Sequence, residues 1–215
     1  MTLYSYIVTY DTGFAPNPFF GYCTLVCCKP AIRRSASVGD WIIGLTPKAQ
    51  GNRVVYFMRV DEKMTIAEYW KDKRFRQKRP QSRGDARRQC GDNIYEPLAT
   101  GGFRQLPSFH SNGEAEDERI KKQDVGGMNA LISETFAYYG AKAIPLPSAL
   151  SPLVAGRHHK SRFSTELLSA FHRFAAKRLG SGTRGVVKTN RLRWGESEYH
   201  CLPISSPGPC INTRF

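Results

Sequence analysis

The alternating segment LYSYIVTYD, residues 3–11, constrains the fold more than any other stretch of the chain. One side of the alternation carries Tyr4, Tyr6, Val8 and Tyr10. Successive side chains of a β-strand point to opposite faces of a sheet, so a period of two predicts a strand here. Further short strands are predicted at 23–28, 41–45 and 53–64, between turns rich in glycine and proline.

Two helices are predicted from their capping residues. Thr65 followed by Glu68 matches a capping box and predicts a short helix. Residues 164–179 repeat apolar side chains at spacings of three and four and end before a glycine, which predicts a longer helix. Residues 129–140 fit either a strand or a short helix. Short strands with few helices predict an α+β fold, a small and partly open β-barrel with attached helices.

Positive charge is the dominant feature of the composition. The chain has 32 Lys and Arg against 18 Asp and Glu, a formal net charge of +14. Residues 71–90 hold nine basic and two acidic side chains, and residues 157–193 hold ten basic side chains and one acidic. Such a charge attracts polyanions, so we expect nucleic acid or a nucleotide as the partner. The run 71–90 is predicted to be a long mobile loop that either stays solvated or orders on phosphate.

Domain organisation follows from the same pass along the chain. We expect one domain over residues 1–182, with the basic loop 71–90 inserted and the helix 164–179 near its end. Residues 183–215 are basic and proline-rich and are predicted to form a poorly ordered tail.

Several protein classes are not indicated by the sequence. No stretch approaches 18 apolar residues and the N-terminus does not resemble a signal peptide, so we expect a cytoplasmic protein without a membrane span. The six cysteines form no CxxC pair and the histidines lack zinc-finger spacing, so no metal is predicted and the thiols are interpreted as buried or incidental. Glycine-rich nucleotide loops and hydrolase motifs are absent, and no cofactor is predicted.

Two polar and aromatic stretches are candidates for a binding site. The segment GDNIYEPLATGGFRQLPSFHS, residues 91–111, combines aromatic anchors with polar groups and contributes Asp92, Asn93, Tyr95, Ser108, His110 and Ser111. The loop after the first strand and the following Gly-Asp turn contribute Phe14, Asn17, Phe19, Tyr22 and Trp41. Aromatic rings here either stack on a base or cover the core, and the polar groups either read a base edge or close their own loops.

The order of several short motifs resembles a known family. The pieces YSYIVTYDTGFAPNPFFGYCTLVCCKPAIRRSASVGDWIIGL, GDNIY, SFHS and AGRHHK together resemble the nucleotide modification associated domain family, second class, over about residues 3–180. That resemblance implies a setting of modified nucleobases in bacterial and phage systems. Where a Gly-His pair is expected, this chain has Arg157-His158-His159, so either histidine is a candidate.

A looser likeness concerns the fold. The arrangement SVGDWIIGL followed by VVYFMRV is similar to EVE and related PUA-like barrels, in which loops and aromatic side chains accept a flipped, modified base. The resemblance implies a base-recognition pocket built by the two candidate stretches.

These observations predict a nucleic-acid-binding or nucleotide-binding protein that recognises a modified base. Phosphate contacts are predicted for Arg33, Arg34, Arg74, Arg76, Lys78, Arg79, Arg157, His158 and Lys160, and for the helix 164–179. An enzyme that modifies or cleaves a nucleotide is the first alternative, with His110, His158, His159 and Asp92 as its catalytic candidates. A basic adaptor in a protein assembly is the second.

Overall fold

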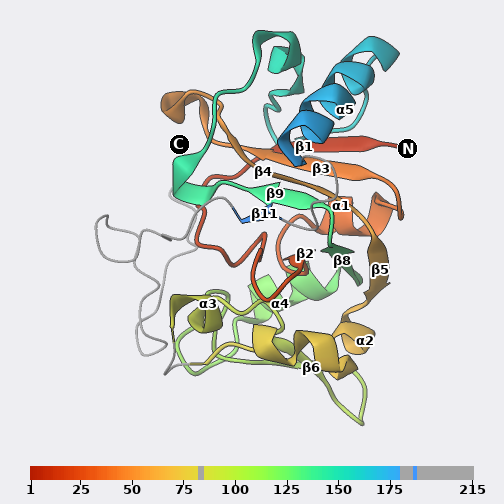
Figure 1. Ribbon diagram of the computed structural model, residues 1–215. Helices are drawn as coiled ribbons and strands as arrows, with labels where there is room; N and C mark the ends of the chain where they lie inside the picture. Colours follow the sequence, from red (N-terminus) through yellow and green to blue (C-terminus); the bar gives the residue numbers. More distant parts are fainter. Residues whose placement is uncertain (82–84, 180–185, 188–215) are drawn as a thin grey trace.

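A six-stranded sheet forms the centre of the protein, which a computed structural model describes over residues 1–81, 85–179 and 186–187 (Figure 1). Its strands lie in the order β10-β1-β3-β4-β9-β11. They span β1 Leu3–Ile7, β3 Trp41–Leu45, β4 Val54–Arg59, β9 Phe136–Tyr138, β10 His159–Lys160 and β11 Val186–Val187. β1 and β3 are parallel, as are β9 and β11, and the other neighbours are antiparallel.

Two smaller antiparallel sheets complete the β-structure. The first has the order β2-β8-β5 and consists of β2 Cys23–Leu25, β8 Asn129–Ser133 and β5 Glu62–Thr65. The second pairs β6 Tyr95–Pro97 with β7 Phe103–Gln105. Within the described residues no sheet closes into a barrel. The α+β class is therefore confirmed, whereas the predicted barrel is not seen.

Short helices connect the strands, and one long helix covers the sheet. The α-helices are α1 Pro30–Ser35, α2 Ile66–Lys71, α3 Ala86–Gln89, α4 Glu118–Val125 and α5 Thr165–Leu179. The 3₁₀ turns are η1 Lys48–Gln50, η2 Lys73–Lys78, η3 Gly140–Lys142 and η4 Ser148–Leu153. Among the described residues, no helix has the length and apolar character needed to cross a membrane.

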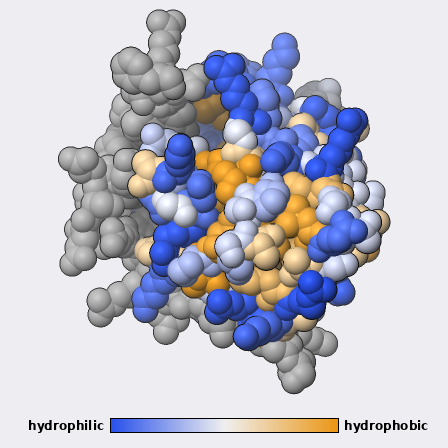
Figure 2. Space-filling model, turned by 90° about the horizontal axis from the view of Figure 1, so that it is seen from above, coloured by the Kyte–Doolittle hydropathy of each residue, from blue (hydrophilic) through white to orange (hydrophobic). Residues whose placement is uncertain are grey.

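The residues of β1, β3, β4 and β9 in the central sheet are almost all buried, so these strands are covered on both faces. Helix α5 packs on one face through Phe171 and Ala175, against Trp41 and Phe57 of the sheet. Seen from the α5 side, hydrophobic residues gather in the middle of the surface and hydrophilic residues surround them (Figure 2). The opposite face packs on the β2-β8-β5 sheet and α1, and beyond these lie α2, α3, α4 and β6 (Figure 1).

Several local predictions are confirmed. The strand predicted at 3–11 begins at Leu3 as expected but ends at Ile7, and the capping box of Thr65 and Glu68 is present at the start of α2. The predicted helix 164–179 is observed as α5, and residues 129–140 contain the two strands β8 and β9 rather than a helix.

The basic run 71–90 differs from its prediction as a long loop. It contains η2 and α3, and Phe75 and Lys78 are buried. The sequence suggested a loop because basic residues dominate, but Phe75 stacks on Tyr69 and anchors the segment to the core. The predicted boundary at residue 182, and the predicted tail apart from 186–187, lie outside the described residues.

The space beside Gly44 of β3 is filled by neighbouring side chains, so a substitution there tests how tightly the core is packed. A Cβ built on Gly44 would lie 2.4 Å from Tyr56 Cε1 and 2.6 Å from Val8 Cγ2. The Tyr56 ring has little freedom to move away because its hydroxyl lies 2.8 Å from that of Tyr6. We expect Gly44→Ala to lower the free energy of unfolding by about 1–3 kcal/mol, measured by urea denaturation.

Gly156→Ala is the matched control, because a Cβ there meets nothing within 4 Å. It should leave the free energy of unfolding within about 0.5 kcal/mol of the original protein. Equal stability of the two variants would contradict the packing described for Gly44.

Candidate active site

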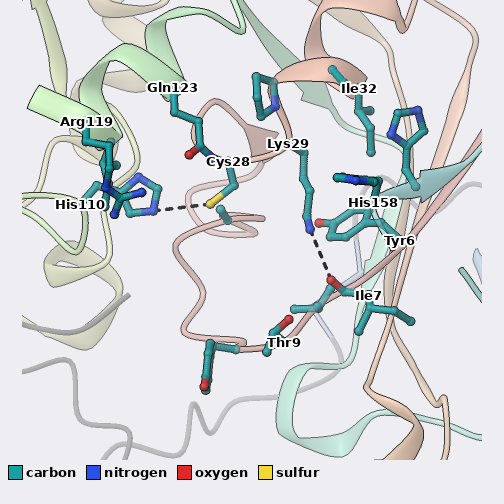
Figure 3. A pocket seen from close by; sticks show the side chains of 17 residues that line it. Tyr6, Ile7, Thr9, Cys28, Lys29, Ile32, His110, Arg119, Gln123 and His158 are labelled. Carbon is teal, nitrogen blue, oxygen red and sulfur yellow. Dashed lines mark hydrogen bonds between the residues drawn. The ribbon is translucent and has the colours of Figure 1, made fainter. Parts of the chain in front are cut away.

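An open pocket of about 610 Å³ lies beside the edge of the central sheet. Its walls come from the end of β1 and the residues after it, from the start of α1, from one face of α4, and from the segment that carries His158 and His159 (Figure 3). Cys28 and His110 both face this space from one side, and a hydrogen bond connects them. The pocket therefore contains a thiol and an imidazole in contact.

Cys28 lies in a strained turn between β2 and α1. Its φ is 59° and that of Lys29 is 41°, a left-handed conformation that side chains other than glycine rarely adopt. Pro30 then begins α1, where its fixed φ suits the first turn. The Cys28 backbone N–H donates to Asp124 Oδ1 at 2.7 Å, which helps to hold the turn. Strain of this kind is concentrated at functional sites in proteins.

His110 is clamped between Cys28 and Asp124. Its Nε2 lies 3.5 Å from Cys28 Sγ and its Nδ1 lies 2.5 Å from Asp124 Oδ2. The ring packs edge-on against Phe14, with 4.7 Å between the ring centroids. The backbone carbonyl of His110 accepts a hydrogen bond from Gln105 Nε2 at 2.8 Å. The ring is therefore held by the Phe14 contact and at both of its nitrogens, and the Gln105 bond holds its backbone.

Asp124 on α4 is fully buried and ionised. Burial acts to raise its pKa, but the charge and hydrogen bond of His110, the Arg33 guanidinium and the Cys28 N–H together hold the pKa below its usual value. The Tyr95 hydroxyl also donates to Asp124 Oδ2, at 2.9 Å. An ionised carboxylate only accepts, so His110 Nδ1 carries a proton. When that is the ring's one proton, Nε2 is an acceptor for the thiol, and when Nε2 has taken the thiol proton, the ring is the imidazolium whose charge lowers the pKa of Asp124.

Arg33 connects the segments that carry Cys28 and Asp124. Its side chain has no exposed surface, and its guanidinium donates to the carbonyls of Cys28 at 2.8 Å, Asp124 at 2.5 Å and Asn129 at 3.0 Å. One guanidinium therefore joins the thiol-bearing turn, α4 and β8. A bidentate or fork-like geometry of this kind is specific to arginine.

Cys27 precedes Cys28 in the chain but does not line the pocket. It is fully buried, and burial raises the pKa of its thiol far above the ordinary range. Cys27, His110 and Asp124 form the one group of three potential metal ligands found in the described part of the chain, with ligand atoms within 4.8 Å of one another. Two ligands of a tetrahedral zinc lie about 3.3 Å apart, so a cation would have to separate His110 Nδ1 from Asp124 Oδ2. The geometry fits the hydrogen bond better than it fits a metal.

The polar residues predicted to read a base lie inside the protein. Asp92 is fully buried and accepts from Thr24 Oγ1 at 2.6 Å and Tyr69 Oη at 2.9 Å. Asn93 Nδ2 donates to the Phe75 carbonyl at 3.1 Å, and Asn17 Nδ2 donates to the Cys90 carbonyl at 2.9 Å. None of the three lines the pocket, and their polar groups hold loops together instead of facing a ligand.

Two predicted phosphate contacts are also buried, which corrects those assignments. Lys78 has no exposed surface, and its ammonium donates to Asn17 Oδ1 at 2.6 Å and to Thr24 Oγ1 at 3.0 Å. Burial lowers the pKa of Lys78 to about 8, against an opposing effect of Asp92. Arg33 is enclosed beneath the site as described above. Neither side chain has surface with which to contact a phosphate.

The aromatic candidates are distributed over two sides of the sheet. Trp41 packs on Phe171 of α5, on the face opposite Cys28. Phe19 is buried, and Tyr22 packs on Phe75. Four other predicted site residues, two aromatic and two serines, lie on the His110 side: Phe14 packs on the ring, Tyr95 bonds Asp124, and Ser108 and Ser111 bond one another within the loop.

The remaining basic candidates lie at the surface. Arg34 donates to the Gly126 carbonyl, Arg74 pairs with Asp72 and Glu62, Arg79 stacks on Trp70, and Lys160 donates to the Pro152 carbonyl. Arg76 and Arg157 are exposed. Of all the predicted site residues, only His110, His158 and His159 line the pocket.

Four residues that complete the site were not predicted from the sequence: Cys28, Asp124, Lys29 and Arg119. No spacing connects them, since 96 positions separate the thiol from the carboxylate. The available signal was the position of the adjacent cysteines in LVCCKP. They stand directly before a Lys-Pro pair that follows a strand, and such a proline marks the first turn of a helix.

The pH dependence of the stability of Asp124→Asn tests whether the Asp124 carboxyl group is ionised in the folded protein. A carboxyl group with a lowered pKa in the folded state stabilises the fold above its unfolded pKa, and this stabilisation is lost as pH falls through the lowered value. We expect Asp124→Asn to lower the free energy of unfolding by about 1–3 kcal/mol at pH 7. The deficit should shrink when urea denaturation is repeated below the ordinary aspartate pKa of 3.8. A deficit that is constant over this range would contradict an ionised Asp124.

Comparisons with known proteins agree with the resemblance seen in the sequence. The model of the family described as nucleotide modification associated domain 2 matches residues 1–188. No curated protein matches the chain, and no solved structure does. The match covers the strained turn, the His110 loop, α4 and the whole pocket. The chain belongs to the nucleotide modification associated domain 2 family.

Proposed function

We propose that this protein is a nucleotide-modifying enzyme in which Cys28 is the nucleophile. One observation carries the proposal: Cys28 Sγ lies 3.5 Å from His110 Nε2, and His110 Nδ1 lies 2.5 Å from the buried Asp124, at the wall of an open pocket. A nucleophile, a base and a group that orients the base, each within reach of the next, are the parts that covalent catalysis requires.

The chemistry follows from these contacts. His110 Nε2 accepts the proton of the Cys28 thiol as Sγ forms a bond to an electrophilic carbon of the substrate. The double bond at that carbon loses its π pair to its far atom, which becomes negative and can receive the proton back from His110. Asp124 keeps the ring in the required tautomer and stabilises the imidazolium that forms in between. No redox partner is needed for this step.

The family supports a nucleotide as the substrate. Its name connects the domain with nucleotide modification, and the net charge of +14 favours anionic partners. His110 was one of the catalytic candidates in the sequence, and in this proposal its partners are Cys28 and Asp124 rather than another histidine.

Recognition of a modified base without turnover is the second candidate function. A pocket of about 610 Å³ is large enough to enclose one nucleotide, and Tyr10 in its lining, which is 49% exposed, offers aromatic surface to a base. A reader of this kind, in bacterial or phage DNA modification, needs the pocket but not the thiol. Cys28→Ser therefore separates the two functions, because a reader keeps its affinity and an enzyme loses turnover.

The reactivity of Cys28 tests the enzyme proposal without knowledge of the substrate. We expect iodoacetamide to modify Cys28 in the folded protein roughly tenfold or more faster than in His110→Gln, because the variant lacks the base that accepts the thiol proton. The rate is measured by peptide mass spectrometry, which resolves each cysteine. Buried Cys23 and Cys27 should remain unmodified in the same samples.

His172→Gln is the matched control, since His172 contacts Trp41 on the α5 side of the sheet and lies outside the pocket. It should leave the Cys28 rate unchanged. Equal rates in the original protein and in His110→Gln would show that the imidazole does not activate the thiol, and the enzyme proposal would fail.

A further inference from the structure

The lining of the Cys28 pocket is positively charged and has no acidic residue. Seventeen residues line it, and among these described residues none is an aspartate or glutamate. Lys29 and Arg119 contribute two full charges, and His158 and His159 add two imidazoles beside that of His110. Neither Lys29 nor Arg119 forms an ion pair with a carboxylate in the described part of the chain. The positive charge is therefore not neutralised by the pocket itself.

Lys29 lies at the centre of this charge. It directly follows Cys28, and its ammonium lies 4.5 Å above the Tyr6 ring and 3.4 Å from the Ile7 carbonyl (Figure 3). Burial lowers the pKa of Lys29, as expected for an ammonium that lacks a carboxylate partner. A π face and one carbonyl leave a hydrogen-bond donor of the ammonium available to an anion.

His159 on the opposite wall responds to the same charge. Burial lowers the pKa of His159, and the positive charges of His158 and Lys29 lower it further. His158 has a φ of 65° and points toward Tyr6, while Arg119 extends beside His110 on the other side (Figure 3). Cationic and imidazole groups thus approach the space from two sides, with Lys29 between them.

We propose that this pocket binds the phosphate of a nucleotide through Lys29, Arg119 and His158, so that the substrate of Cys28 is a phosphorylated nucleotide and not a nucleoside or free base. The inference rests on the proposed function. A dianionic phosphate would neutralise the charges of Lys29 and Arg119. The apolar part of the lining, at Val8, Ala15 and Ile32, would then lie beside the base. A nucleoside would leave the cations without a counter-charge.

Protection of Cys28 from iodoacetamide tests the inference. The probes are the four deoxynucleoside monophosphates, the matching nucleosides, inorganic phosphate and a short single-stranded oligonucleotide. We expect at least one monophosphate to protect Cys28 at a concentration tenfold or more below that of its nucleoside. Protection by the oligonucleotide alone, with the same dependence on Lys29, would also support phosphate recognition and would identify the source as a polymer.

Charge variants separate specific binding from general attraction. Lys29→Gln should raise the protecting concentration tenfold or more, and Arg119→Gln, at an exposed position of α4, should raise it in the same direction. Lys142→Gln removes an equal charge at an exposed site outside the pocket and should change nothing. If Lys29→Gln does not fold, Arg119→Gln carries the test.

The outcomes distinguish this inference from the proposed function. If Cys28 reacts rapidly in a His110-dependent manner but nucleosides protect as well as monophosphates, or if nucleosides, monophosphates and the oligonucleotide all fail to protect, phosphate recognition is wrong and the nucleophile proposal stands. Equal effects of Lys29→Gln and Lys142→Gln would also overturn it. If Cys28 reacts slowly whether or not His110 is present, the proposed function itself has failed.

Discussion

The buried carboxylate of Asp124 is the interaction on which the site depends. A carboxylate without exposed surface is very unfavourable unless donors surround it. Here the donors come from three separate segments: the Cys28 backbone, the Tyr95 hydroxyl and the His110 ring. Because each donor is needed to stabilise the charge, the charge in turn fixes the position of each. The thiol and the imidazole meet as a consequence of this arrangement.

Arg33 extends this organisation to the backbone. Its guanidinium bonds three carbonyls, including those of Cys28 and Asp124, so the strained turn and α4 cannot separate without leaving buried groups unpaired. The left-handed conformations of Cys28 and Lys29 are thereby offset by hydrogen bonds on both sides of the peptide. The same turn directs the thiol and the ammonium into one pocket, which brings the nucleophile next to the charge that would bind its substrate.

The sequence predicted the secondary-structure elements that are specified by a few neighbouring residues. The alternation in residues 3–11 indicated β1, and the pair Thr65 and Glu68 indicated the start of α2, because both signals act over a few residues. It did not predict the burial of Lys78 or Arg33, since lysine and arginine are rarely buried and their partners come from distant segments. Asp92 and Asn93 were expected to face a ligand because aspartate and asparagine are also mostly exposed. Cys28 and Asp124 carry no shared motif, and only the folded chain brings them together.

The protonation state of the His110 ring shows whether Asp124, His110 and Cys28 act as one catalytic group. Nitrogen chemical shifts of labelled histidine, assigned with His110→Gln as reference, report which ring nitrogen carries a proton. We predict a proton on Nδ1, directed at Asp124, whether Nε2 is bare or has taken the proton of the Cys28 thiol. A His110 ring with Nδ1 unprotonated, or with Nδ1 bound to a metal ion beside Cys27, would contradict the assignment of Asp124, His110 and Cys28 as one catalytic group.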